Sequence, residues 1–169
     1  VPVSIDPGPT FGHGAHPTTA LVLAEVDRLA GPNMSMLDVG CGSGVLAIAA
    51  ARLGAGPVVG IDVEADAVAW TRTNAVANAV DVSASTTPIT DVPGTFDLVL
   101  ANVLPVVHDA IASAVTARRA EQGVLVVSGI PDERADRVVG CYVAFGLTEE
   151  RRTSIDGWTA AVLTGPVVG

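Results

Sequence analysis

The glycine-rich stretch after the first apolar run constrains the fold of this chain more than any other feature. The run Met36–Val39 is interrupted only by Asp38, and glycine then occupies alternate positions, at Gly40, Gly42 and Gly44. The apolar, alanine-rich residues 45–51 that follow predict a helix. Such a strand, turn and helix let a ligand approach the backbone closely and reach the free N–H groups that begin the helix.

The spacing of these glycines and two acidic residues narrow the choice of ligand. A dinucleotide-binding turn, G-x-G-x-x-G, would place its third glycine where Val45 stands, so a pyrophosphate-binding turn is disfavoured. Asp38 would repel a phosphate but suits a cationic group, such as the amino group of a methionyl tail. Asp62 ends the next apolar run, and its carboxylate can accept two hydrogen bonds from a ribose diol. A glycine-rich turn of another α/β protein is the alternative.

Composition indicates one domain over residues 1–169 and excludes some functions. The chain is 49% apolar and 4% aromatic, which suits a parallel sheet covered by helices on both faces. Its formal charge is −9, it has no lysine, and its arginines form no basic stripe, so direct nucleic-acid binding is not expected. An acidic surface suits a cationic partner, although solubility explains it equally well. The two cysteines show no metal-ligand spacing, no membrane-length apolar run occurs, and we expect a cytoplasmic protein.

The pattern of apolar runs predicts a Rossmann-like, mostly parallel seven-stranded sheet with a C-terminal antiparallel hairpin. Strands are expected at about 35–39, 58–61, 81–84, 96–101 and 123–128, with a hairpin of 146–152 and 158–163. Helices are expected at about 17–30, 43–53, 64–78, 105–119 and 131–145. The carboxyl ends of the strands should then bring together the Gly40 loop, Asp62 and Asn102.

Segments along nearly the whole chain resemble the catalytic domain of the PrmA family. They are Asp6-Pro7-Gly8, Phe11-Gly12, Gly14, His16–Thr19, Asp38–Gly44, Leu46–Ala50, Gly60–Asp62, Ala101–Leu104, Ser128–Ile130 and the ending Asp156-Gly157-Trp158 with Leu163 and Gly165. The resemblance implies a class I S-adenosylmethionine-dependent methyltransferase. Enzymes of this family methylate ribosomal protein eleven of the large subunit on lysine side chains and an N-terminal amine.

The resemblance also implies roles for individual residues. By the resemblance, cofactor contacts are expected from Thr19, Gly40, Asp62 and Asn102, and the glycine loop itself adds Asp38, Cys41 and Gly42 as expected contacts. Asn102 is expected to orient the acceptor amine, with His16 as a second catalytic candidate. Phe11, His13 and Trp158 are expected to line the substrate channel, and residues 1–15 to form a lid or leader. The alternatives are a helix start at Thr18-Thr19, a histidine bonded to a backbone carbonyl, a turn-forming Asn102 and a packed Trp158; His108 is expected to be a surface or packing residue.

Departures from the family pattern leave the methyl acceptor open. The chain has Gly12-His13-Gly14-Ala15-His16 where the family usually has Gly-Thr-Gly-Thr-His, and the family carries an N-terminal recognition domain before this point. The chain is therefore an excised protein methyltransferase domain, a free-standing N-methyltransferase for a small amine, or a cofactor-binding module inactive without a recognition domain. No base is compelling, so we expect solvent to deprotonate the amine. The sequence does not indicate an oligomeric state.

Overall fold

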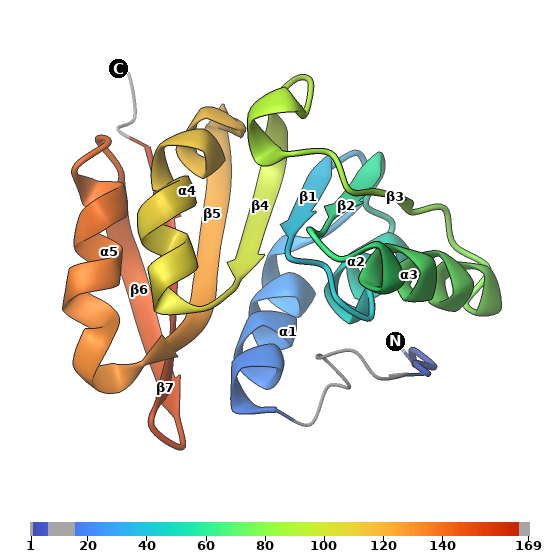
Figure 1. Cartoon of the computed structure of the whole chain (residues 1–169), viewed down its shortest axis with the longest axis horizontal. Coiled ribbons are helices and arrows are strands. Elements are labelled where there is room, and N and C mark those ends of the chain that lie inside the picture. Colours follow the sequence, from blue (N-terminus) through green and yellow to red (C-terminus); the bar gives the residue numbers. More distant parts are fainter. Residues whose placement is uncertain (1, 7–15, 166–169) are drawn as a thin grey trace.

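A computed structural model describes residues 2–6 and 16–165, in which a seven-stranded sheet carries helices on both faces (Figure 1). The strands are β1 (Met36–Val39), β2 (Val58–Ile61), β3 (Ser83–Ser85), β4 (Phe96–Asn102), β5 (Arg119–Pro131), β6 (Thr148–Ile155) and β7 (Trp158–Thr164). The helices are α1 (Pro17–Leu29), α2 (Val45–Arg52), α3 (Ala65–Ala77), α4 (Pro105–Ala117) and α5 (Ala135–Val143), with 3₁₀ turns η1 (Ile89–Asp91) and η2 (Asp132–Arg134). No described helix is long and apolar enough to cross a membrane.

The strand order confirms the predicted fold class. The order is β3-β2-β1-β4-β5-β7-β6, with β1 to β5 mutually parallel. The predicted hairpin forms, and β7 lies between β5 and β6 and antiparallel to both. Its turn uses Asp156 and Gly157, both at positive φ, as tight hairpins require. The chain moves outward from β1 to β3 and then returns to the other side of β1, which leaves a crevice at the carboxyl ends of β1 and β4.

Two apolar clusters, one on each face, hold the helices against the sheet. The side chains of alternate β4 residues pack on opposite faces of the sheet, because side chains of a strand alternate in direction. Val99 and Ala101 belong to the cluster beneath α4 and α5, which lie in front of the sheet in Figure 1. Leu98 and Leu100 belong to the cluster beneath α1 and α2. The absence of large aromatic side chains from most of this core agrees with its Val, Leu, Ile and Ala composition.

Four elements have boundaries that differ from the predicted ones. Strand β6 covers Thr148–Ile155 rather than 146–152, because its pairing with β7 continues to the pair Ile155 and Trp158 at the turn. Strand β3 covers Ser83–Ser85 rather than 81–84. Strand β5 begins at Arg119 instead of 123, because the guanidinium of Arg119 donates to the carbonyls of Ala120, Glu121 and Gly123 and holds this polar stretch beside β4. The helix expected at 131–145 begins only at Ala135, because pairing with β7 extends β5 as far as Pro131.

Candidate functional site

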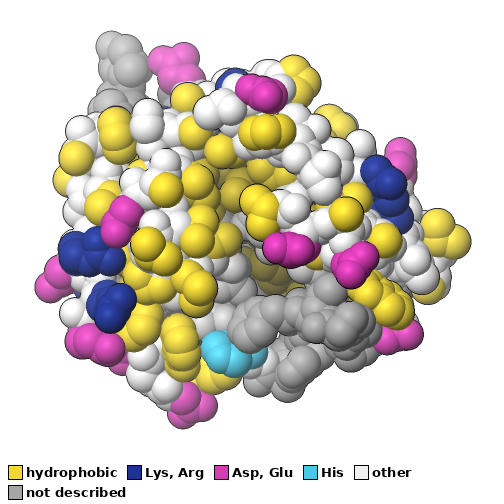
Figure 2. All heavy atoms as spheres, viewed as in Figure 1, with side chains coloured by type: hydrophobic (Ala, Val, Ile, Leu, Met, Phe, Trp, Pro, Cys, Tyr) yellow, Lys and Arg dark blue, Asp and Glu magenta, His cyan; other side chains and the backbone are white. Residues whose placement is uncertain are grey.

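A crevice of about 1000 Å³ opens at the point where the strand order reverses. It is bounded by the start of α1, the glycine loop after β1, the end of β2, residues 86–89 and the turn between β4 and α4. Figure 2 shows it as a hollow with hydrophobic side chains in its walls and acidic side chains at its edge. The predicted site residues that line it are His16, Thr19, Gly40, Cys41, Gly42, Asp62, Asn102 and Trp158.

The glycine loop lies so close to its neighbours that side chains would not fit. Gly40, Gly42 and Gly44 have φ values of 78°, 54° and 82°, which L side chains rarely adopt. A Cβ at Gly40 would lie 2.7 Å from Val103 Cγ1, and one at Gly44 would lie 2.9 Å from Thr71 Cγ2. The loop is therefore packed between the β4–α4 turn and α3, with its backbone exposed to the crevice.

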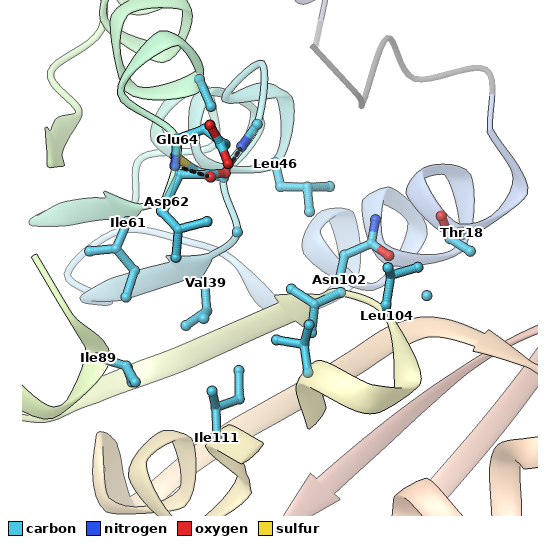
Figure 3. A pocket seen from close by; sticks show the side chains of 18 of the residues that line it. Thr18, Val39, Leu46, Ile61, Asp62, Glu64, Ile89, Asn102, Leu104 and Ile111 are labelled. Carbon is cyan, nitrogen blue, oxygen red and sulfur yellow. Dashed lines mark hydrogen bonds between the residues drawn. The ribbon is translucent and has the colours of Figure 1, made fainter. Parts of the chain in front are cut away.

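The carboxylate of Asp62 connects the glycine loop to the start of α3. Its Oδ2 accepts from the N–H of Gly42 at 3.0 Å, and its Oδ1 accepts from the N–H of Glu64 at 3.0 Å (Figure 3). A carboxylate has about four acceptor sites, so two remain for hydroxyl groups in the crevice. The two backbone bonds fix the direction in which those sites point.

Asp38 lies behind the glycine loop, fully buried, and does not itself line the crevice. Neither carboxylate oxygen has a hydrogen-bond partner among the described residues. Burial raises the pKa of Asp38 to about 7, and the negative charge of Asp62 adds to this rise. The backbone N–H of Ala47 partly offsets the rise through its dipole, although it forms no hydrogen bond with the carboxylate. Asp38 is thus a buried carboxylate whose ionised form a nearby cation would stabilise. Its contact with a cofactor stays a prediction.

Two further buried groups border the loop. The Thr19 hydroxyl lines the crevice and also lacks a partner in the described part of the chain, although Thr19 stands in the first turn of α1. The Cys41 Sγ lies 3.3 Å from Thr71 Oγ1, whose own proton goes to the carbonyl of Gly42, and burial raises the pKa of the thiol to about 12. Cys41 therefore remains a thiol at neutral pH and packs the loop without nucleophilic character.

Asn102 ends β4 with its side-chain amide directed into the crevice (Figure 3). The amide makes no hydrogen bond to any described residue, so it is available to a ligand. The backbone beside it is held firmly: the N–H of Val103 donates to the carbonyl of Ser128 at 3.2 Å. A side chain at Gly129 would collide with the carbonyl of Val103, so this turn lies directly against β5.

His16 and Trp158 form one wall of the crevice. His16 is the N-cap of α1, where its Nδ1 accepts from the N–H of Thr18 at 3.4 Å and lies 2.9 Å from Thr18 Oγ1. Its ring meets Trp158 edge to face, with centroids 5.1 Å apart. His16 thus has a capping role as well as a place in the site. The predicted channel residues Phe11 and His13, and most of the predicted leader, lie outside the described residues.

His108 is fully buried rather than exposed on its helix, and it supports the site from behind. Its Nε2 lies 2.8 Å from the carbonyl of Ser128, which can only accept, so Nε2 carries the proton and Nδ1 accepts from the Tyr142 hydroxyl at 2.7 Å. Burial lowers the pKa of His108, which keeps the ring neutral. The helical spacing of Pro105, His108, Ala112 and Val115 marks the buried face of α4 and could have revealed this placement.

This sheet order and glycine-loop crevice define a class I methyltransferase domain. The structure superposes on a ribosomal protein L11 methylase from Lactobacillus delbrueckii subsp. bulgaricus with a TM-score of 0.87 and 28% identity, over 95% of this chain and 82% of the other. The N-methyltransferase NodS from Bradyrhizobium japonicum WM9, in complex with S-adenosyl-l-homocysteine, shares the fold with a TM-score of 0.70 and 17% identity, over 90% and 89% of the two chains.

The sequence comparisons identify the family. The family model of ribosomal protein L11 methyltransferase (PrmA) matches residues 1–165, and the chain belongs to this family. Ribosomal protein L11 methyltransferase of Geobacter metallireducens is 45% identical over 157 residues, which cover 93% of this chain and 52% of the relative. That of Methylobacillus flagellatus is 42% identical over 164 residues, 96% of this chain and 54% of the relative. The chain thus spans about half the length of the curated relatives it matches, and the resemblance seen in the sequence is confirmed.

Proposed function

We propose that this domain binds S-adenosylmethionine in the crevice and transfers its methyl group to an amino group of a protein, the ribosomal protein L11 for which its relatives are named. One observation carries the proposal above all. Asp62 places a fixed carboxylate acceptor in the crevice, and Asp38, with no hydrogen-bond partner among the described residues, lies buried behind the glycine loop, so together they complement a nucleoside that has a cationic tail. A ribosomal substrate would place the enzyme in the cytoplasm.

The residues present fit this cofactor. The two remaining acceptor sites of Asp62 suit the ribose hydroxyls, and the apolar side chains of Ile61 and Ile89 beside it suit a purine ring. The backbone of the glycine loop borders the methionyl end. There Asp38 would attract the positive charge from behind the loop, because a buried carboxylate interacts with a cation through a low dielectric. The Thr19 hydroxyl, which has no hydrogen-bond partner in the described part of the chain, supplies a further polar group.

The cofactor would supply a methyl group already activated on a positively charged sulfur, so the chain has mainly to position the acceptor. The amide oxygen of Asn102 would accept a hydrogen bond from the amine and direct its lone pair toward the methyl group. Of the described lining residues only His16 has a side chain of suitable basicity, and its Nδ1 already accepts from Thr18. We therefore propose that the amine loses its proton to solvent.

Transfer of radiolabelled methyl groups from S-adenosylmethionine to purified L11 tests the proposal. We expect label in L11 with the full-length protein that carries this domain, and at least a hundredfold less with its Asn102→Ala variant. Assays of the domain by itself show whether it needs a recognition region. Labelling of small amines but never of L11 would contradict the protein substrate, and failure of the domain to bind S-adenosylmethionine would contradict the whole proposal.

A further inference from the structure

Residues 3–6 lie extended along α3, held by two asparagine side chains. The Asn78 Oδ1 accepts from the N–H of Ser4 at 2.9 Å, and its Nδ2 donates to the carbonyl of Ser4 at 2.6 Å. Asn74 does the same one helical turn earlier, where Oδ1 accepts from the N–H of Asp6 at 3.0 Å and Nδ2 donates to its carbonyl at 2.9 Å. Each amide therefore pairs with both peptide groups of one residue, as a neighbouring β-strand would.

The geometry of strand and helix explains why this pairing can repeat. Alternate residues of an extended strand are about 6.6 Å apart, and four residues of an α-helix advance about 6 Å. Asparagines spaced i, i+4 thus match residues spaced i, i+2. The residues between them, Val3 and Ile5, are partly buried against the apolar cluster beneath α1 and α2. The segment runs toward the amino-terminal end of α3, which lines the crevice.

Asn74 also holds the glycine loop. Asn74 is only 2% exposed, and its Nδ2 donates a second hydrogen bond, to the carbonyl of Ser43 at 2.9 Å. One turn earlier on α3, Thr71 Oγ1 donates to the carbonyl of Gly42 at 3.0 Å. Two side chains of α3 therefore orient two consecutive peptide groups of the loop. Only Asn74 bonds the N-terminal segment as well.

We infer that Asn74 is a positioning residue that couples the docking of residues 3–6 to the shape of the glycine loop. Its two amide protons go to the two segments, so rotation of the amide to suit one alters the bond to the other. A ligand that stabilises the loop must then stabilise the docked segment, and the docked segment must raise the affinity of the loop for that ligand by the same factor. This inference rests on the proposed function for the ligand, S-adenosylmethionine.

Amide hydrogen exchange of Ser4 and Asp6 tests the coupling without recourse to activity, because both N–H groups donate to the asparagines. Saturating S-adenosylhomocysteine is expected to slow exchange at both amides roughly three- to tenfold, the effect of about one hydrogen bond. Unchanged exchange at saturation would overturn the inference. Calorimetry on the same sample shows whether the ligand has bound, so failure of the coupling is distinguished from failure of the proposed function.

Variants on α3 provide the reciprocal test. Asn74→Ala is expected to weaken S-adenosylhomocysteine binding roughly tenfold and to raise KM for S-adenosylmethionine with kcat changed less than twofold. Asn78 bonds Ser4 but no described residue of the loop, and Asn78→Ala is expected to weaken binding about threefold. The matched control is Thr73→Ala, whose hydroxyl bonds only the carbonyl of Ala69 within the helix. Affinities of Asn74→Ala and Asn78→Ala equal to that of the control would refute the coupling.

Discussion

Replacement of Asp38 by Asn should stabilise the fold and weaken the site at the same time. The carboxyl is fully buried, has no partner among the described residues and has a pKa raised from 3.8 to about 7 by burial. Below pH 3.8 the carboxyl is protonated in both the folded and the unfolded chain, and its ionisation costs nothing. Between pH 3.8 and 7 the unfolded chain releases this proton and the folded chain keeps it, so the folded state loses stability as pH rises.

The size of this effect follows from the pKa values. A difference between 3.8 and about 7 corresponds to on the order of 4 kcal/mol at pH 8, fully developed once the pH exceeds the pKa of the folded state. Asparagine has nearly the same shape and no charge, so it removes the pH-dependent part. The gain of Asp38→Asn over wild type should therefore grow from pH 4 to pH 7 and then level off.

Urea unfolding of both proteins at several pH values between 4 and 8 measures this difference, because titrating groups that do not interact with Asp38 cancel between them. The same variant should bind S-adenosylmethionine roughly tenfold more weakly, since it has lost the negative charge behind the glycine loop that would attract the cationic tail. If the free energies of unfolding of the two proteins differed by the same amount at every pH from 4 to 8, Asp38 would not be a destabilising carboxylate in the folded state.

Three further substitutions test other parts of the site. Asp62→Ala should weaken cofactor binding in calorimetry by roughly a hundredfold, because the ribose acceptors and the bond to Gly42 are both lost, whereas the exposed Asp81→Ala serves as a control and should match wild type. Asn102→Ala should lower kcat and leave the Kd for S-adenosylmethionine within about threefold; equal losses in both would refute its role toward the acceptor. Tyr142→Phe leaves His108 Nδ1 without its Tyr142 partner in the core and should cost about 1–3 kcal/mol in urea unfolding, and an unchanged midpoint would contradict a stabilising role for this hydrogen bond.

The positions of Gly40, Asp62 and Asn102 could be predicted because they depend on local pattern. Each follows an apolar run, and the carboxyl ends of parallel strands meet at one edge of a sheet whatever the intervening sequence. The place of Asp38 behind the loop, rather than in the crevice wall, depends on how tightly the loop packs against Val103 and Thr71. That packing joins residues far apart in the chain and leaves no periodic signal.

Other features stayed hidden because distant segments create them. The Asn74 side chain bonds Asp6, 68 residues away, and Ser43, 31 residues away, and an asparagine on a helix gives no sign of either. The early start of β5 similarly depends on the hydrogen bonds that the Arg119 guanidinium donates to nearby backbone carbonyls. His108 is a milder case, because its spacing from Ala112 and Val115 already marks a buried face.

The most direct test of the central claim is a crystal structure of this chain with S-adenosylhomocysteine. We expect the ribose hydroxyls within hydrogen-bond distance of the Asp62 carboxylate, the amino-acid end along the glycine loop, and the sulfur on the side of the crevice that Asn102 faces. A ligand bound elsewhere, or one in this crevice with its ribose away from Asp62, would contradict it.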